Sequence, residues 1–169
     1  MIMGTSRRVT RGKRQRGNAI IEGALVILPL MAIGFAMLDF PLAIFIQNTL
    51  RSAVREGVRF AITQQTGASG QDAAIKTVVE NNSMGFLNDS DITSGVSSFA
   101  INYYSTNALG ALVAANGNGS NAGGNVIVVS ATINHKFMAP LWSSTGLIPF
   151  SASSSDMMEA PPNNIPPAR

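Results

Sequence analysis

The fold of this chain is decided by residues 17–46, which read GNAIIEGALVILPLMAIGFAMLDFPLAIFI. Between Gly23 and Ile46 the only ionisable side chain is Asp39. A helix over these residues is about 36 Å long at ~1.5 Å per residue, which is enough to cross a hydrocarbon core of ~30 Å with some tilt. The stretch therefore predicts one membrane-spanning helix.

A basic leader precedes this helix. Residues 1–16 contain no acid and hold half of the 12 basic residues of the chain, namely Arg7, Arg8, Arg11, Lys13, Arg14 and Arg16. Without them the formal charge of +3 becomes −3, so the positive charge belongs to the leader and not to a nucleic-acid-binding surface. The positive-inside rule places the leader in the cytoplasm and residue 70 onward outside.

Two other interpretations of the leader stay open. It could be a nucleic-acid-binding tail, or the start of a removable secretory signal peptide. A signal peptide has an apolar region of only about 7–15 residues that ends at a small-residue cleavage site. The apolar run here is longer and continues into a helical pattern without a break, which favours a retained membrane helix.

Two acids lie within the membrane stretch. Glu22 is just inside its apolar start, and Asp39 is expected near the outer head-group level as an interfacial acid. A carboxylate in a membrane segment is costly and usually has a partner or access to water. Glu22 is therefore either a pairing residue or a hydrated residue at the inner interface. Pro29 and Pro41 each remove one backbone hydrogen bond and can kink the helix.

The helical pattern continues beyond Ile46 and carries two stripes. Arg51, Arg55 and Arg59 are spaced four apart and form a basic stripe, which is either a solvated face or a contact for lipid head groups or for acids of a neighbouring subunit. The other stripe is apolar and predicts a face packed on a domain; its members are Ile46, Leu50, Ala53, Val54, Gly57, Val58 and Ala61. Residues 66–70 contain two glycines and are expected to end the helix.

The remaining pattern predicts a small α+β domain. A short helix is expected over 72–80, turns over 81–95, and about three antiparallel strands over 96–105, 126–137 and 150–154. The Asn- and Gly-rich residues 107–125 are expected to form a surface loop, and 141–148 an apolar connection. The predicted organisation is a basic cytoplasmic leader (1–17), a transmembrane and extended helix (18–66), an extracytoplasmic domain (67–159) and a Pro-rich extended tail (160–169).

Few residues suit catalysis. The chain has no cysteine, and His135 is the only histidine, so thiolate chemistry and a two-His metal motif are ruled out, and a His-containing triad would have to use His135. His135 is expected to point outward from its strand. Asp89 and Asp91 are close in sequence but lack EF-hand spacing. We therefore expect no enzymatic activity, no metal and no cofactor.

The N-terminal residues resemble the TadE-like family, which comprises minor pilins or pseudopilins of the tight-adherence (Flp, type IVb) pilus system of bacteria. The resemblance covers residues 14–160, and its most specific features lie in the first 45 or so of these. They are the run RGNAIIE over 16–22, Leu28-Pro29-Leu30, Asp39-Phe40, and AVREGVRFA over 53–61. Pro140-Leu141 and Met157-Met158-Glu159 are similar to the C-terminal part of the family.

The resemblance implies a role in assembling or priming a thin adhesive pilus. A prepilin peptidase would cleave after Gly17, which would make Asn18 the new N-terminus and Glu22 the fifth mature residue. Implied partners are the lipid bilayer, other pilin and pseudopilin subunits, the peptidase and the assembly platform of the inner membrane, but no nucleic acid. Gly23 follows Glu22 where pilins often carry an aromatic residue. An uncleaved single-pass envelope scaffold or binding protein is the alternative.

Overall fold

The structure is a computed structural model that describes residues 15–138 and 146–169. Most of the leader and most of the apolar connection expected at 141–148 lie outside the described residues. The elements in chain order are α1 (Gln15–Ile62), α2 (Gln71–Asn82), α3 (Asp89–Thr93), β1 (Ser98–Thr106), β2 (Leu112–Ala114), β3 (Val126–His135), β4 (Ile148–Met157) and a 3-10 turn, η1 (Pro162–Asn164). This arrangement confirms the predicted α+β class.

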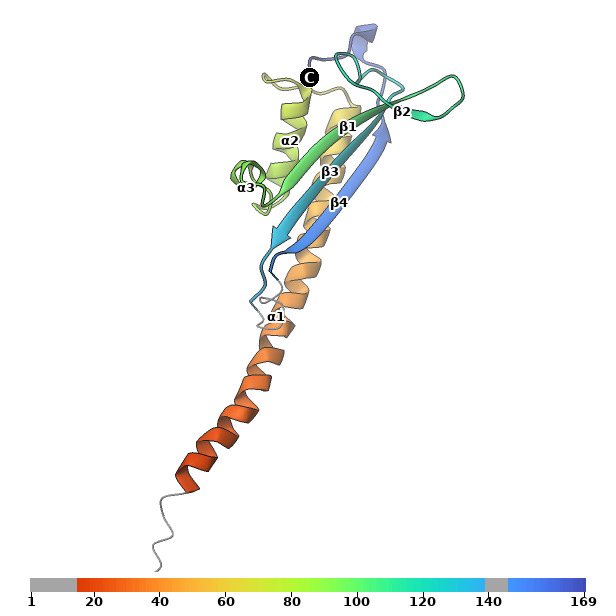
Figure 1. The fold of residues 1–169 in the computed structure, drawn as a ribbon. Coiled ribbons are helices and arrows are strands. Elements are labelled where there is room, and N and C mark those ends of the chain that lie inside the picture. Colours follow the sequence, from red (N-terminus) through yellow and green to blue (C-terminus); the bar gives the residue numbers. More distant parts are fainter. Residues whose placement is uncertain (1–14, 139–145) are drawn as a thin grey trace, which may run out of the picture.

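The helix α1 is a stalk with a domain on its upper part (Figure 1). Its lower part extends alone from the domain, and its upper part packs against α2, β3 and β4. The helix continues through Pro29 and Pro41 as a single element. The change from a free to a packed helix follows the sequence, because apolar residues surround the axis below Asp39 and keep to one stripe above it.

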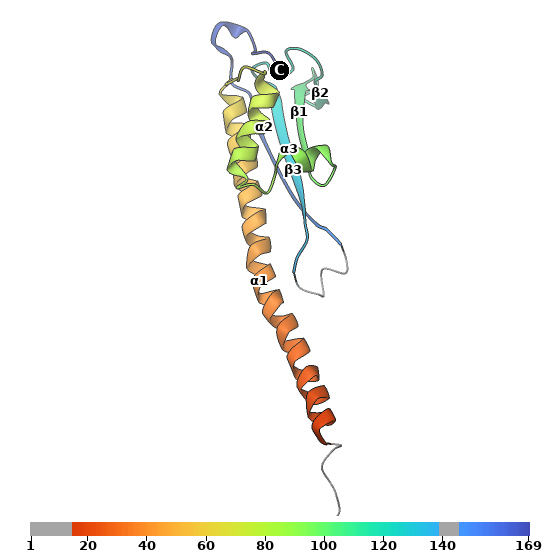
Figure 2. The same cartoon turned by 90° about the vertical axis from the view of Figure 1, so that its left-hand side faces the viewer.

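The sheet is antiparallel with strand order β2-β1-β3-β4. Ile101 on β1 faces Val129 on β3, which faces Ser154 on β4. Along β3, buried residues alternate with partly exposed ones, as the period of two requires. Figure 2 shows α1 and α2 side by side on one face of this sheet. The opposite face carries many polar and small side chains, such as Ser130 and Ser153, together with Tyr104, Val128 and Met157.

The expectation of about three strands was too low, because the sheet has four. The additional strand, β2, lies within residues 107–125, which were expected to form a loop throughout. All three residues of β2 are exposed, so no alternation of buried and exposed positions marked it in the sequence. The short helix α3 was likewise missed within the turn-rich 81–95, where Asn88 caps it by accepting from the Asp91 backbone N–H.

The core lies between the helical face and the sheet. It is built from the predicted apolar stripe of α1, one face of α2 and the inward residues of the strands; fully buried members include Leu50, Val54, Ile75, Val79, Ile127 and Val129. Burying a side chain of this size contributes about 1.5–3 kcal/mol. The absence of cysteine means that this packing is not supported by any disulfide.

His135 does not point outward as expected. It shares the inward parity of Ile133 on β3, and its ring packs edge-on against Phe86 and Phe137. The strand period was read correctly, but the polar side chain was assigned to the wrong face. The neighbouring aromatic rings offer contact area that an outward position lacks.

Gly57 sets the approach of α1 to α2. A Cβ added at this position would overlap the Cγ2 methyl of Val79 on α2. Val79 is fully buried and β-branched, so it has little room to turn away. The two helices are therefore packed at a distance that only glycine permits.

We expect Gly57→Ala to destabilise the domain by up to about 2 kcal/mol. Overpacking costs about 1–3 kcal/mol, which outweighs the roughly 1 kcal/mol that alanine gains over glycine in a helix. Thermal unfolding of the full chain in detergent measures the effect. Gly34→Ala, on the same helix with nothing within 4 Å of the added Cβ, should not lower the midpoint, because alanine favours the helix and meets no neighbour there. A Val79→Ala background should remove the penalty, and a persistent loss there would contradict the explanation.

Candidate membrane and assembly site

The residues expected at a cleavage site lie at the beginning of α1. Gly17 and Asn18 belong to its first turn, since the helix begins at Gln15. The backbone N–H groups of a first turn have no intrahelical partner, and helix ends fray. Glycine lowers helix stability by roughly 1 kcal/mol relative to alanine. This turn is therefore the part of α1 that opens most easily.

Glu22 is exposed on the free part of α1. Its neighbours on the helix are Ile20, Ile21, Leu25 and Val26, which are all more than half exposed. Among the described side chains no ion pair includes Glu22. The domain begins many turns higher, so Glu22 takes no part in its packing (Figure 1).

The apolar surface around Glu22 is continuous. The part of the chain that the structure describes contains one helical segment, Ala19–Ile62, that is long and apolar enough to cross a membrane, and its most apolar window is not buried at all. The core helix of a soluble protein is mostly buried, whereas the most apolar window of this helix is fully free of the domain. The exposure supports a single-pass membrane protein.

Asp39 has a different environment. Its side chain is only 5% exposed, and its Oδ1 accepts the Met138 backbone N–H at 3.3 Å. Met138 follows β3, so this contact joins the lower end of the sheet to the helix. Glu22 and Asp39 are about 25 Å apart along α1 at ~1.5 Å per residue. The structure therefore places the two acids in separate sites.

The basic stripe faces away from the core. Arg51, Arg55 and Arg59 are exposed, and Arg59 lies 3.9 Å from the carboxylate of Glu56. An exposed pair of this kind contributes about 0–1 kcal/mol. Beside Arg59, a polar groove of ≈ 380 Å³ runs between α1 and α2. The stripe is thus available to a partner and is not needed for the fold.

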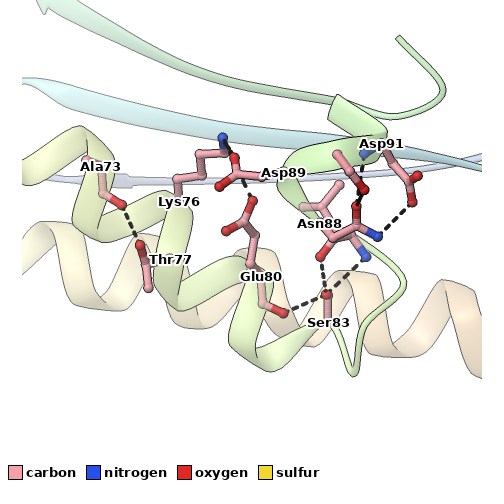
Figure 3. Close-up of polar contacts among 10 residues, drawn as sticks. Ala73, Lys76, Thr77, Glu80, Ser83, Asn88, Asp89 and Asp91 are labelled. Atoms are coloured by element: carbon pink, nitrogen blue, oxygen red, sulfur yellow. Dashed lines mark hydrogen bonds and ion pairs between the residues drawn. The ribbon is translucent and has the colours of Figure 1, made fainter. Parts of the chain in front are cut away.

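A polar cluster joins α2 to α3 (Figure 3). Lys76 pairs with Asp89 and lies 3.8 Å from Glu80. The hydrogen bond from Lys76 to Asp89 raises the pKa of the lysine, against the effect of its burial. Burial, together with the charge of Asp89, raises the pKa of Glu80 above its ordinary value.

This cluster does not form a metal site. Asp91 accepts from the Asn88 side chain at 2.8 Å, so its carboxylate stabilises the start of α3. Among residues 15–138 and 146–169, no three His, Asp or Glu side chains come together in a way that could hold a metal ion. The cluster is best described as a clamp between two short helices. The sequence signal for it was weak, because Lys76 and Asp89 are too far apart for any helical spacing rule.

A second polar cluster, which the sequence did not reveal, fixes the Pro-rich segment. The Gln71 backbone N–H donates to the Ala168 carbonyl at 2.8 Å, and the Asn121 side chain donates to both Gln71 and Pro167. Gln71 and Asn121 are fully buried. The segment expected to be an extended tail is therefore packed on the top of the domain.

Arg169 completes this cluster. Its guanidinium donates to Asp72 at 2.9 Å and lies 4.4 Å from the ring centre of Tyr103. The Tyr103 hydroxyl also donates to Asp72, at 2.7 Å. Burial, followed by this bond to a carboxylate, raises the pKa of Tyr103 well above its usual range. The cluster ties α2, β1 and the C-terminal segment together.

The comparison with protein families concerns α1. Residues 17–59 match the family model described as TadE-like protein. This segment is TadE-like. The match contains Gly17, Glu22, Asp39 and the basic stripe, and it confirms the resemblance seen in the sequence over these residues. No curated protein and no solved structure matches the chain. The match lies within α1 and does not extend to the sheet domain.

We expect Asp39→Ala to destabilise the lower end of the domain and Glu22→Ala to leave it unchanged. Asp39→Ala removes the acceptor of the part-buried Met138 N–H bond, and a hydrogen bond to a charged group contributes about 1.5–3 kcal/mol. Hydrogen exchange of residues 136–138 should therefore accelerate, and thermal stability in detergent should fall. Glu22→Ala is the matched control, because it removes an acid from the free part of the same helix. Equal effects of the two changes on residues 136–138 would contradict this assignment.

Proposed function

We propose that this chain is a membrane-anchored minor pilin or pseudopilin that takes part in assembling or priming a tight-adherence pilus. The observation that carries the proposal is the TadE-like match over a helix whose apolar surface and single inner acid are left free by the domain. The expected placement is in the bacterial inner membrane, with the leader in the cytoplasm and the sheet domain outside. The chain has a structural role in this proposal and no enzymatic one.

The free half of α1 supports an assembly role. A side chain of Glu22 in hydrocarbon needs a partner or water, since isolated charges there cost several kcal/mol. A subunit cleaved after Gly17 carries a new amine at Asn18, four residues before Glu22. That amine lies about 6 Å lower on its own helix. A neighbour displaced outward by about 6 Å would bring its amine level with this carboxylate, so the pair would set the register between subunits.

The alternative is an uncleaved single-pass envelope scaffold or binding protein. It would use the same span and the same outer domain, and Gly17 would stay inside the first turn of α1. The two proposals differ in the N-terminus of the mature chain. The exposed basic stripe is compatible with both, because it can contact head groups or acids of another subunit.

Processing is the first test. In cells with an active prepilin peptidase, mass spectrometry of the membrane-extracted protein should find Asn18 as the first residue. Gly17→Phe should block cleavage and preserve the full-length chain, because a bulky residue replaces the small one at the expected cleavage position. Gly23→Ala, one and a half turns further on, is the control and should be cleaved normally. Recovery of the intact chain in wild-type cells would favour the scaffold.

Glu22 is the second test. Glu22→Ala and Glu22→Gln should both lose co-purification with the other pilin components while the outer domain stays folded. Removing one member of a buried pair costs about 3–5 kcal/mol, and glutamine keeps the shape but not the charge. Glu56→Gln, an exposed acid on the same helix, is the matched control and should change binding little. Normal co-purification and normal piliation in both Glu22 variants would contradict a pairing role for Glu22.

A further inference from the structure

The lower end of the sheet exposes apolar side chains next to the membrane helix. Met138, after β3, is 70% exposed, and Leu147, before β4, is 50% exposed. Phe40 on α1 is 68% exposed, and Lys136 is exposed as well. We call these four residues the rim. Large exposed apolar groups gathered at one end of a small domain mark an interaction surface.

The height of the rim is fixed by the contact with Asp39. The Met138 backbone N–H donates to Asp39 Oδ1, so the rim stands level with this turn of α1. From Ala19, where the span begins, to Asp39 the helix rises about 30 Å, which equals the thickness of a hydrocarbon core. With α1 across the bilayer, the rim falls where the outer acyl chains meet the head groups. Figure 1 shows the lower ends of β3 and β4 beside α1.

The charge of this end suits a lipid surface. Residues 130–155 contain Lys136 and His135 but no acid, whereas Asp156 and Glu159 lie at the opposite end of β4. An apolar groove of ≈ 420 Å³ opens between the sheet end and α1, lined by Ala36, Asp39, Phe40, Ala43, Phe137, Ile148 and Phe150. The surface is thus apolar below and cationic beside it, which is the composition of segments that lie in a membrane interface.

We propose that the rim rests in the outer head-group layer of the bilayer that α1 spans. Met138 and Leu147 enter the boundary between head groups and acyl chains, and Lys136 contacts lipid phosphates. The proposal rests on the membrane placement of α1 in the proposed function. Its consequence is mechanical, because a domain held by both its stalk and its rim keeps one orientation before the subunit leaves the membrane.

The absence of cysteine makes a direct test possible. Single variants Met138→Cys and Leu147→Cys of the full chain are labelled with an environment-sensitive fluorophore. They are reconstituted at low protein density in phosphatidylcholine vesicles, with or without phosphatidylglycerol. Both labels should show blue-shifted emission and be quenched several-fold less by the neutral aqueous quencher acrylamide than a label at Leu109→Cys. Leu109 is 92% exposed at the far end of the domain, and Leu28→Cys serves as the reference within the hydrocarbon.

Lys136→Glu tests the charged part of the rim. It should abolish the additional protection from the neutral aqueous quencher acrylamide that phosphatidylglycerol gives the Met138 label, and Lys136→Arg should retain it. Rim labels as accessible as the Leu109 label, with a protected Leu28 label, would overturn this inference alone. An accessible Leu28 label would overturn the membrane placement as well. Protection that vanishes on dilution of protein in lipid would assign the rim to a second copy of the chain and overturn the lipid contact.

Discussion

The helix α1 has two different surroundings along its length: its lower part is free of the domain, and its upper part packs on it. In its lower part every direction around the helix is apolar, and in its upper part only one stripe is, with arginines opposite. A fully apolar helix is stable in lipid, and a one-sided helix is stable against a domain. The change from one pattern to the other occurs between Asp39 and Ile46, where the sheet also ends. The rest of the fold follows from this transition, because the domain can pack only where the helix offers a single apolar face.

The upper domain is small and has no disulfide, so polar clamps supplement its core. The Lys76–Asp89 pair holds α3 to α2, while the buried Gln71 and Asn121 hold the C-terminal segment. Gln71 and Asn121 are fully buried, where hydrogen bonds are stronger than in water, whereas the Asp89 side chain is 74% exposed and its pair with Lys76 contributes less. The clamps lie at the side and top of the domain. They leave the stalk and the basic stripe free for other contacts.

Much of the stalk could be predicted from the sequence, because its signals are local and repeated. The period of the apolar stripe from Ile46 to Ala61 identified the packed face of α1, and alternation identified β3. The features that were missed depend on distant partners. β2 is three exposed residues paired to β1, and the docking of Arg169 on Tyr103 and Asp72 joins positions far apart in the chain. No spacing rule marks such contacts. His135 is different, because its parity with Ile133 was visible in the sequence and only its polarity led to the outward assignment.

The two acids of α1 have different surroundings and therefore different expected roles. Asp39 is buried and accepts a hydrogen bond from the Met138 backbone N–H within the subunit, so the folded domain leaves it little accessible to a neighbour. Glu22 lies about 25 Å away on a surface that the domain never reaches. A carboxylate satisfied inside the subunit cannot select a neighbour, whereas one left exposed in an apolar segment gains most from a cationic partner. In the proposed function, a subunit built in this way folds completely while anchored, and Glu22 remains exposed for a contact with a neighbouring helix.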